Sequence, residues 1–276
     1  MIRKRMRYAQ NFLKDTQLIR ILVGKSSINR QDSVFEIGFG QGLLTRQLAL
    51  RAGHVTAVEV DPVLKSTVGN SLLTFASNIT VECADVELIG IPLHCNKVFA
   101  NIPFNRTARI VRMIYEAKNI TEAFLVMQTE AAAKYSGEPR ETEASLLVKP
   151  RFAFQVLHRF NRNDFEPMPN VDVVLLRIAK REECLFTSSD NEAFRSFVRF
   201  GFRSTKPALR LTFKKVFTHE QWKRLSEEMR FSREASPTML SFDQWRGLFG
   251  QFLARVSEPK RRLILGSDSE LNGDQQ

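Results

Sequence analysis

The sequence has few of the residues that would indicate disulfides or a metal site. Its 3 cysteines, Cys83, Cys95 and Cys184, are far apart and form no zinc-type pair, and its 4 histidines show no ligand spacing. We therefore expect neither disulfides nor a metal, and a protein that works in a reducing compartment such as the cytoplasm.

Long hydrophobic runs are also absent. No apolar stretch approaches the roughly 20 residues of a membrane helix. Residues 1–7 are basic but lack the apolar segment of a signal peptide. These two absences predict a soluble, unexported protein with no membrane partner.

Acidic residues are scarce where basic residues gather. The formal net charge is +11, which favours a polyanionic partner because phosphate contacts release counterions. Residues 194–216 contain no acid, and Arg3, Lys4, Arg5 and Arg7 form a basic N-terminal arm. The basic residues of the acid-free stretch are Arg195, Arg199, Arg203, Lys206, Arg210, Lys214 and Lys215. Such a run is usually a solvated helix face, but its length without an acid favours contact with RNA phosphates.

The chain divides by pattern into two parts. Residues 1–180 alternate strands and helices, and an antiparallel strand pair is expected near 151–157 and 173–178. Residues 181–265 read as helical, and Phe197 and Phe213 in the basic stretch are expected in its core. The polar tail 266–276 is expected to be disordered.

A glycine-rich turn follows the first buried strand, at 33–37. Gly38 and Gly40 come next, and glycine permits positive φ and close approach of a ligand. The strand 54–58 then ends in Glu59 and Val60, and an acid at this place can bind ribose hydroxyls. The G-x-G-x-G spacing disfavours a nicotinamide oxidoreductase, whose turn is G-x-G-x-x-G.

The third strand, 78–83, is followed by Asp85 and Val86. Asp85 is placed to accept a hydrogen bond from an adenine amine, with Val86 against the ring. The alternative is a simple loop aspartate at a strand end.

The fourth strand, 97–100, is followed by Asn101, Ile102, Pro103 and Phe104. An amide oxygen and a backbone carbonyl can accept hydrogen bonds from an exocyclic amine, proline fixes the chain direction, and an aromatic ring can stack on a base. The set suits a planar amine presented for chemistry; the alternative is an ordinary proline turn.

Together and in this order, these motifs resemble the ribosomal RNA adenine N6-dimethyltransferase family, whose main bacterial branches are the Erm and KsgA enzymes. The N-terminal motif of that family matches Gln10 to Leu13, and its catalytic motif matches Asn101 to Phe104. A later motif matches Phe165, Pro167, Pro169, Val171 and Asp172. The resemblance is strong over about 8–180 and looser to about 260, and Phe104 replaces the tyrosine common in the family.

The resemblance implies a class I methyltransferase fold of α/β type, a Rossmann-like mixed sheet with a small C-terminal helical domain. It implies S-adenosyl-L-methionine as cofactor and the domains 1–180 (methyltransferase), 181–265 (RNA-binding) and 266–276 (tail). The implied cofactor residues are Gln10, Asn11, Leu13, Gly38, Gly40, Glu59, Val60, Asp85, Val86 and Asn101. Those implied for catalysis are Asn101, Ile102, Pro103 and Phe104. The RNA residues are Phe104, Phe165, Arg195, Arg199, Arg203, Lys206 and Arg210.

In the mechanism that follows, Asn101 and the Ile102 carbonyl accept the two N6 hydrogens of a target adenine. Phe104 stacks on the base, while Phe165 either closes its other face or is buried against Pro167 and Pro169. We expect a monomer that methylates 23S ribosomal RNA and confers resistance to macrolides, lincosamides and streptogramin B. The alternatives are a KsgA-type enzyme acting on 16S ribosomal RNA and a relative that binds nucleic acid without catalysis.

Overall fold

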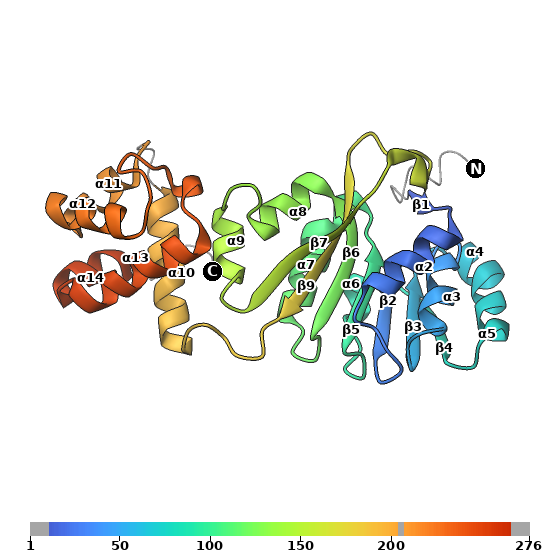
Figure 1. The fold of residues 1–276 in the computed structure, drawn as a ribbon. Helices are drawn as coiled ribbons and strands as arrows, with labels where there is room; N and C mark the ends of the chain where they lie inside the picture. The colour runs from blue at the N-terminus through green and yellow to red at the C-terminus, as the bar shows by residue number, and fades with distance from the viewer. Residues whose placement is uncertain (1–10, 204–206, 266–276) are drawn as a thin grey trace. The chain divides into compact units, whose positions relative to one another are not determined.

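A computed structural model describes residues 11–203 and 207–265 and divides the chain into two compact units (Figure 1). The first comprises Met1–Ala132 with Ala153–Arg181, and the second Ala133–Phe152 with Glu182–Gln276. The sequence pattern predicts residues 133–152 in the first domain, whereas they belong to the second unit. Of the helices in the described residues, none is both long and apolar enough to span a membrane.

The first unit is built on a seven-stranded sheet of order β4-β3-β2-β5-β6-β9-β7. The pairs from β4 through β6 are parallel, and β9 is antiparallel to β6, so the mixed sheet predicted from the sequence is confirmed. The strands of this sheet are β2 (Ser33–Ile37), β3 (His54–Glu59), β4 (Ile79–Cys83), β5 (Lys97–Asn101), β6 (Glu122–Gln128), β7 (Phe152–Arg159) and β9 (Val173–Lys180).

Helices alternate with the parallel strands, as the crossover connections of a parallel sheet require. They are α2 (Thr16–Lys25), α3 (Leu43–Ala49), α4 (Pro62–Leu64), α5 (Asn70–Phe75), α6 (Val86–Ile89) and α7 (Thr107–Glu116), with the short turns η1 (Lys65–Gly69), η2 (Phe104–Arg106) and η3 (Arg162–Asp164). Buried aliphatic and aromatic side chains of the sheet, such as Val34, Phe99 and Phe124, form the core beneath them.

A second, two-stranded sheet joins the N-terminal motif to a distant segment. Strand β1 (Phe12–Leu13) pairs antiparallel with β8 (Phe165–Glu166), with Leu13 opposite Phe165. Both side chains are buried in the core of the first unit. The pairing fixes the main chain around Asn11 against the body of the unit.

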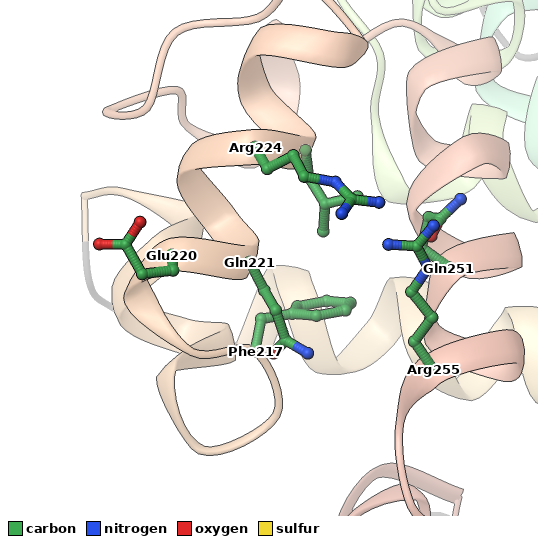
Figure 2. Close-up of a pocket in the computed structure, with 7 residues that line it drawn as sticks. Phe217, Glu220, Gln221, Arg224, Gln251 and Arg255 are labelled. Carbon is green, nitrogen blue, oxygen red and sulfur yellow. The ribbon is translucent and has the colours of Figure 1, made fainter.

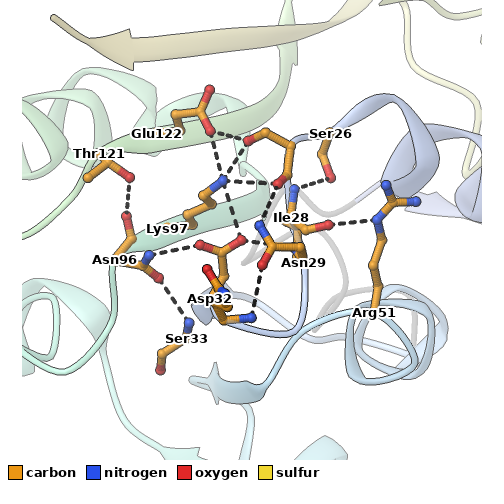
Figure 3. Close-up of polar contacts among 12 residues, drawn as sticks. Ser26, Ile28, Asn29, Asp32, Ser33, Arg51, Asn96, Lys97, Thr121 and Glu122 are labelled. Atoms are coloured by element: carbon orange, nitrogen blue, oxygen red, sulfur yellow. Dashed lines mark hydrogen bonds and ion pairs between the residues drawn. The ribbon is translucent and has the colours of Figure 1, made fainter. Parts of the chain in front are cut away.

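The amino-terminal ends of β2, β5 and β6 are tied together by a buried polar network (Figure 3). The Lys97 ammonium lies 2.9 Å from Glu122 Oε2 and 3.4 Å from Asp32 Oδ2, and it also donates to the Ser27 hydroxyl. Arg177 on β9 donates to the other oxygen of Glu122. Because nearly every charge here has a partner, burial of the network is tolerable.

The second unit is helical, and its core is rich in aromatic side chains. Its elements are α8 (Thr129–Ser136, which begins in the first unit), α9 (Glu143–Val148), α10 (Ser188–Arg203), α11 (Leu209–Thr212), η4 (Phe213–Lys215), α12 (His219–Glu228), η5 (Pro237–Met239), α13 (Phe242–Arg255) and α14 (Glu258–Leu265). Phe197 and Phe213 are fully buried there, as predicted. Gly201 allows α10 to approach α13, since a Cβ at Gly201 would lie 2.4 Å from Trp245 Cη2.

Candidate active site

The carboxyl ends of the parallel strands carry the residues singled out from the sequence. Parallel strands end at one edge of a sheet, and ligands of open α/β sheets bind outside that edge. A cavity of about 330 Å³ opens there, lined by Gly38, Glu59, Asp85 and Pro103 among others. Two smaller cavities of about 30 Å³ each adjoin it. Gly38 and Asn101 line both of the smaller cavities, and Gly38 also lines the large one. The predicted motifs therefore meet around one site.

The glycine turn has one open and one filled position. Gly38 has φ +78°, and a Cβ built on it would meet nothing within 4 Å, so its bare face opens to the cavities. Gly40 has φ +50°, but a Cβ there would lie 2.6 Å from Phe12 Cε1. Gly38 thus leaves room for a ligand, whereas Gly40 makes room for the N-terminal strand.

Glu59 ties the glycine turn to the end of β3. It is 2% exposed, and its carboxylate accepts hydrogen bonds from the N–H groups of Gly40 (3.0 Å), Val60 (2.9 Å) and Asp61 (3.2 Å). Burial raises the pKa of Glu59, and these backbone hydrogen bonds oppose the rise. An ionised carboxylate has about four acceptor positions. One therefore remains for a hydroxyl of a ligand in the large cavity, which Glu59 and Val60 line.

Asp85 is paired with a residue that the sequence analysis did not single out. Its Oδ1 caps helix α6 by accepting from the Glu87 N–H at 3.0 Å, and Arg106 donates to its two oxygens at 2.9 and 3.0 Å. Arg106 also lies 3.0 Å from Glu87 Oε1. Burial alone would raise the pKa of Asp85, but these hydrogen bonds and the Arg106 charge lower it. Asp85, Val86 and Arg106 all line the large cavity.

The orientation of the Asn101 side chain is set by its neighbour. The amide lies 2.7 Å from the backbone carbonyl oxygen of Asn11, and a carbonyl oxygen can only accept, so the atom facing it is Nδ2. The other amide atom, Oδ1, is thereby left as an acceptor at the cavity that Asn101 shares with Phe104.

The rest of the Asn-Ile-Pro-Phe motif is held firmly. The Ile102 N–H donates to the Val126 carbonyl of β6 at 3.0 Å, and the Ile102 side chain is buried. Pro103 lines two of the cavities, and half-buried Phe104 lines one of them while it packs against the core. The motif therefore presents one amide and one ring on a rigid support.

Glu36 is a further buried carboxyl at the site, and it was not among the predicted site residues. It is fully buried on β2, both its oxygens lack a hydrogen-bond partner among the described residues, and it lines a small cavity with Gly38 and Asn101. Burial raises its pKa to about 8, with the Glu59 charge adding to the rise and the nearby Thr45 hydroxyl opposing it. The sequence signal that could have identified Glu36 is an acid among the apolar residues of a buried strand.

Several predicted residues lie elsewhere. Phe165 is 3% exposed, with its ring 5.1 Å from that of Phe160, so burial favours the structural alternative for it over base stacking. Arg195, Arg199 and Arg203 lie on α10 of the second unit. Arg210 lies on α11 of the same unit and forms an ion pair with Glu234 at 2.6 Å. Gln10, Lys206, the basic arm and the tail 266–276 fall outside the described residues.

The described residues contain no cluster of three or more His, Cys, Asp or Glu side chains able to hold a metal ion. The site instead offers carboxylates, one oriented amide and a bare glycine face. These acceptors can bind hydroxyl, amine and cationic groups of a ligand.

The chain is similar in sequence and fold to known rRNA methyltransferases. An rRNA adenine N-6-methyltransferase from Saccharopolyspora erythraea is 29% identical, over 94% of this chain and 68% of the relative. A ribosomal RNA small subunit methyltransferase A from Chlorobium phaeobacteroides is 32% identical, over 75% of this chain and 78% of the relative.

A solved structure described as the 23S rRNA methyltransferase ErmE superposes with a TM-score of 0.82 at 28% identity, covering 88% of this chain and 99% of the other. The family model described as ribosomal RNA adenine dimethylase matches residues 1–250. As its motifs predicted, the chain belongs to the ribosomal RNA adenine dimethylase family.

Proposed function

We propose that this chain transfers methyl groups from S-adenosyl-L-methionine to the N6 amine of one adenine in 23S ribosomal RNA. The observation that carries the proposal is the Asn101 amide, whose Nδ2 is committed to the Asn11 carbonyl at 2.7 Å and whose Oδ1 remains at the cavity beside Phe104. An amide oxygen held in this orientation can accept a hydrogen bond from the N–H of a base amine. The proposed methyl transfer therefore requires no strong base.

The cavities fit the parts of this cofactor. In the large cavity, Glu59 accepts from ribose hydroxyls, while Asp85 has an unused acceptor position for the adenine amine and Val86 offers an apolar surface. Glu36 faces the adjoining small cavity, where an ionised carboxyl would attract a cationic ammonium or sulfonium group. When bound, the cofactor supplies an electrophilic methyl group on sulfur.

The residues around the small cavity that Asn101 shares with Phe104 activate the amine by positioning it. The N6 lone pair of adenine is delocalised into the ring and is a weak nucleophile. Asn101 Oδ1 and the Ile102 carbonyl accept the two N6 hydrogens and hold the nitrogen in a pyramidal form with its lone pair toward the methyl carbon. Fixing such a geometry supplies several kcal/mol of the barrier. Phe104 stacks on the adenine, which leaves its RNA stack to reach the site.

The direct test incubates the purified chain with radiolabelled S-adenosyl-L-methionine and, separately, with 23S and 16S ribosomal RNA. Incorporation into 23S RNA, mapped to one adenine by reverse-transcription stops, supports the proposal. Lack of incorporation into either RNA, with cofactor binding intact, would support a nucleic-acid-binding relative without catalysis.

A second candidate is methylation of 16S RNA, and one observation favours it. The Chlorobium phaeobacteroides relative is named as a small subunit enzyme. Its identity to this chain is 32%, compared with 29% for the Saccharopolyspora erythraea relative. Expression in the cytoplasm of a macrolide-sensitive bacterium separates the two candidates. Resistance to macrolides, lincosamides and streptogramin B is expected only if the target is in 23S RNA.

A further inference from the structure

The second unit contains a small cavity whose lining residues have no role in the proposed methyl transfer. It has a volume of about 180 Å³ and lies between α12 and α13 (Figure 2). The residues that line it include Phe217, Gln221, Arg224, Leu225, Gln251 and Arg255. Its size is below the roughly 300–1,000 Å³ of sites for drug-sized ligands, so it suits one small planar group.

Two cations converge on this cavity. The guanidinium groups of Arg224 and Arg255 both extend over it, whereas the carboxylate of Glu220 points away (Figure 2). Arg224 is held by Glu228 at 2.7 Å, and Arg255 has no ion pair with any described residue. Two like charges that face one space without an acid between them favour an anion there.

The wall of the cavity offers an apolar surface and two amides. The apolar part is the small exposed fraction of Phe217 and Leu225, each 4% exposed, that lines the cavity. Gln221 Oε1 accepts from the Thr218 N–H at 2.8 Å, which leaves its Nε2 to donate. Gln251 Oε1 is buried and lacks a hydrogen-bond partner among the described residues. A donor and an acceptor beside an aromatic ring are what the edge of a nucleobase requires.

We propose that this cavity binds one extruded nucleotide of the substrate RNA, with the base against Phe217 and Leu225 and its phosphate between Arg224 and Arg255. The net charge of +11 is complementary to this occupant. The inference rests on the proposed RNA substrate and adds to it a nucleotide site in the helical unit.

The first test measures binding of nucleoside 5′-monophosphates and of inorganic phosphate to the full chain carrying Asn101→Ala, in which methyl transfer is expected to be about 10³-fold slower. A nucleotide should bind more tightly than phosphate, and Arg224→Gln with Arg255→Gln should weaken it about tenfold. The matched control pair, Arg246→Gln with Arg262→Gln, removes two arginines of the same unit that pair with Asp243 and Glu258. The control should change binding less than twofold.

The second test separates a base site from a bare anion site. Gln251→Leu keeps the volume but removes the buried amide, so it should weaken nucleotide binding and leave phosphate binding unchanged. With single-stranded RNA, the plot of log affinity against log salt should lose about 0.7 of slope when both pocket arginines are removed, because they share one phosphate.

Equal binding of phosphate and nucleotides, or equal effects of the pocket and control pairs, would overturn the inference. Because the readout is binding, these outcomes are independent of methyl transfer. If the unmodified chain methylates ribosomal RNA while both tests fail, the proposed function stands and only the nucleotide site is lost.

Discussion

The polar residues at the two ends of strand β5 differ in how fully their polar atoms are hydrogen-bonded. Lys97 at the start is buried and surrounded by partners, namely Asp32, Glu122 and Ser27 (Figure 3). Among the described residues, Asn101 at the end donates from Nδ2 to the Asn11 carbonyl, and its Oδ1 is left at a cavity. A satisfied polar network stabilises a fold, whereas an oriented group with an unused acceptor is prepared for a ligand.

Two of the buried carboxyls of the sheet, Glu122 and Glu36, repeat this contrast. Burial favours protonation of both, but hydrogen bonds from Ser27, Lys97 and Arg177 outweigh it and lower the pKa of Glu122. Glu36 has no hydrogen-bond partner among the described residues, and burial raises its pKa to about 8. The difference follows from the complete burial of Glu36 and from the hydrogen-bond donors that surround Glu122.

The largest expected effect is on catalysis and comes from Asn101→Ala. Removing the only side-chain acceptor proposed for the amine should lower the rate of methyl transfer about 10³-fold, by analogy with the loss of one positioned group in other active sites. Affinity for S-adenosylhomocysteine, measured by calorimetry, should change less than threefold. Equal losses of rate and affinity would mean that Asn101 only shapes the cofactor site.

At the other end of the strand, Lys97→Met should act on stability and not on chemistry. It leaves Asp32 and Glu122 buried with less compensation, which costs about 3–5 kcal/mol in unfolding free energy. Urea denaturation measures the loss. The rate per folded molecule, determined under conditions where the variant is folded, should stay within twofold of the original. A large rate defect in folded protein would break the comparison between the two ends.

The sequence was sufficient for the order of motifs because strands, glycine turns and the acids after them are local patterns. It could not show that Arg106 reaches Asp85 and Glu87, since that contact depends on how α7 starts relative to α6. Nor could it show that Phe165 is buried, because the pairing of β1 with β8 joins segments far apart in the chain. Burial and pairing across the fold decide which predicted residues remain available to a ligand.

The contrast between the carboxyls predicts a pH dependence. Because the pKa of Glu36 is higher in the folded state, its contribution to stability is full below the ordinary value of 4.5 and is lost as pH rises to about 8. The slope contributed by this group is about 1.4 kcal/mol per pH unit in that window. In Glu36→Gln this slope should disappear, as measured by urea unfolding from pH 5.5 to 8.5.

Glu122→Gln is the matched control for that experiment. The pKa of Glu122 is lowered, so its contribution is present above 4.5 and is lost only in more acidic solution. The variant should lose stability by a similar amount at every pH between 5.5 and 8.5, with no change of slope. Parallel slopes for Glu36→Gln and the unmodified chain would contradict the raised pKa of Glu36.

The smallest expected effect concerns Phe104, whose ring lies between the core and the cavity of Asn101. Stacking of a base on an aromatic ring contributes about 1–3 kcal/mol, so Phe104→Ala should raise the KM for RNA by about fivefold or more. Phe104→Tyr keeps the ring and should stay within twofold in both KM and kcat. If Tyr and Ala were equally defective, the ring would act by packing against the core and not by stacking on the target adenine.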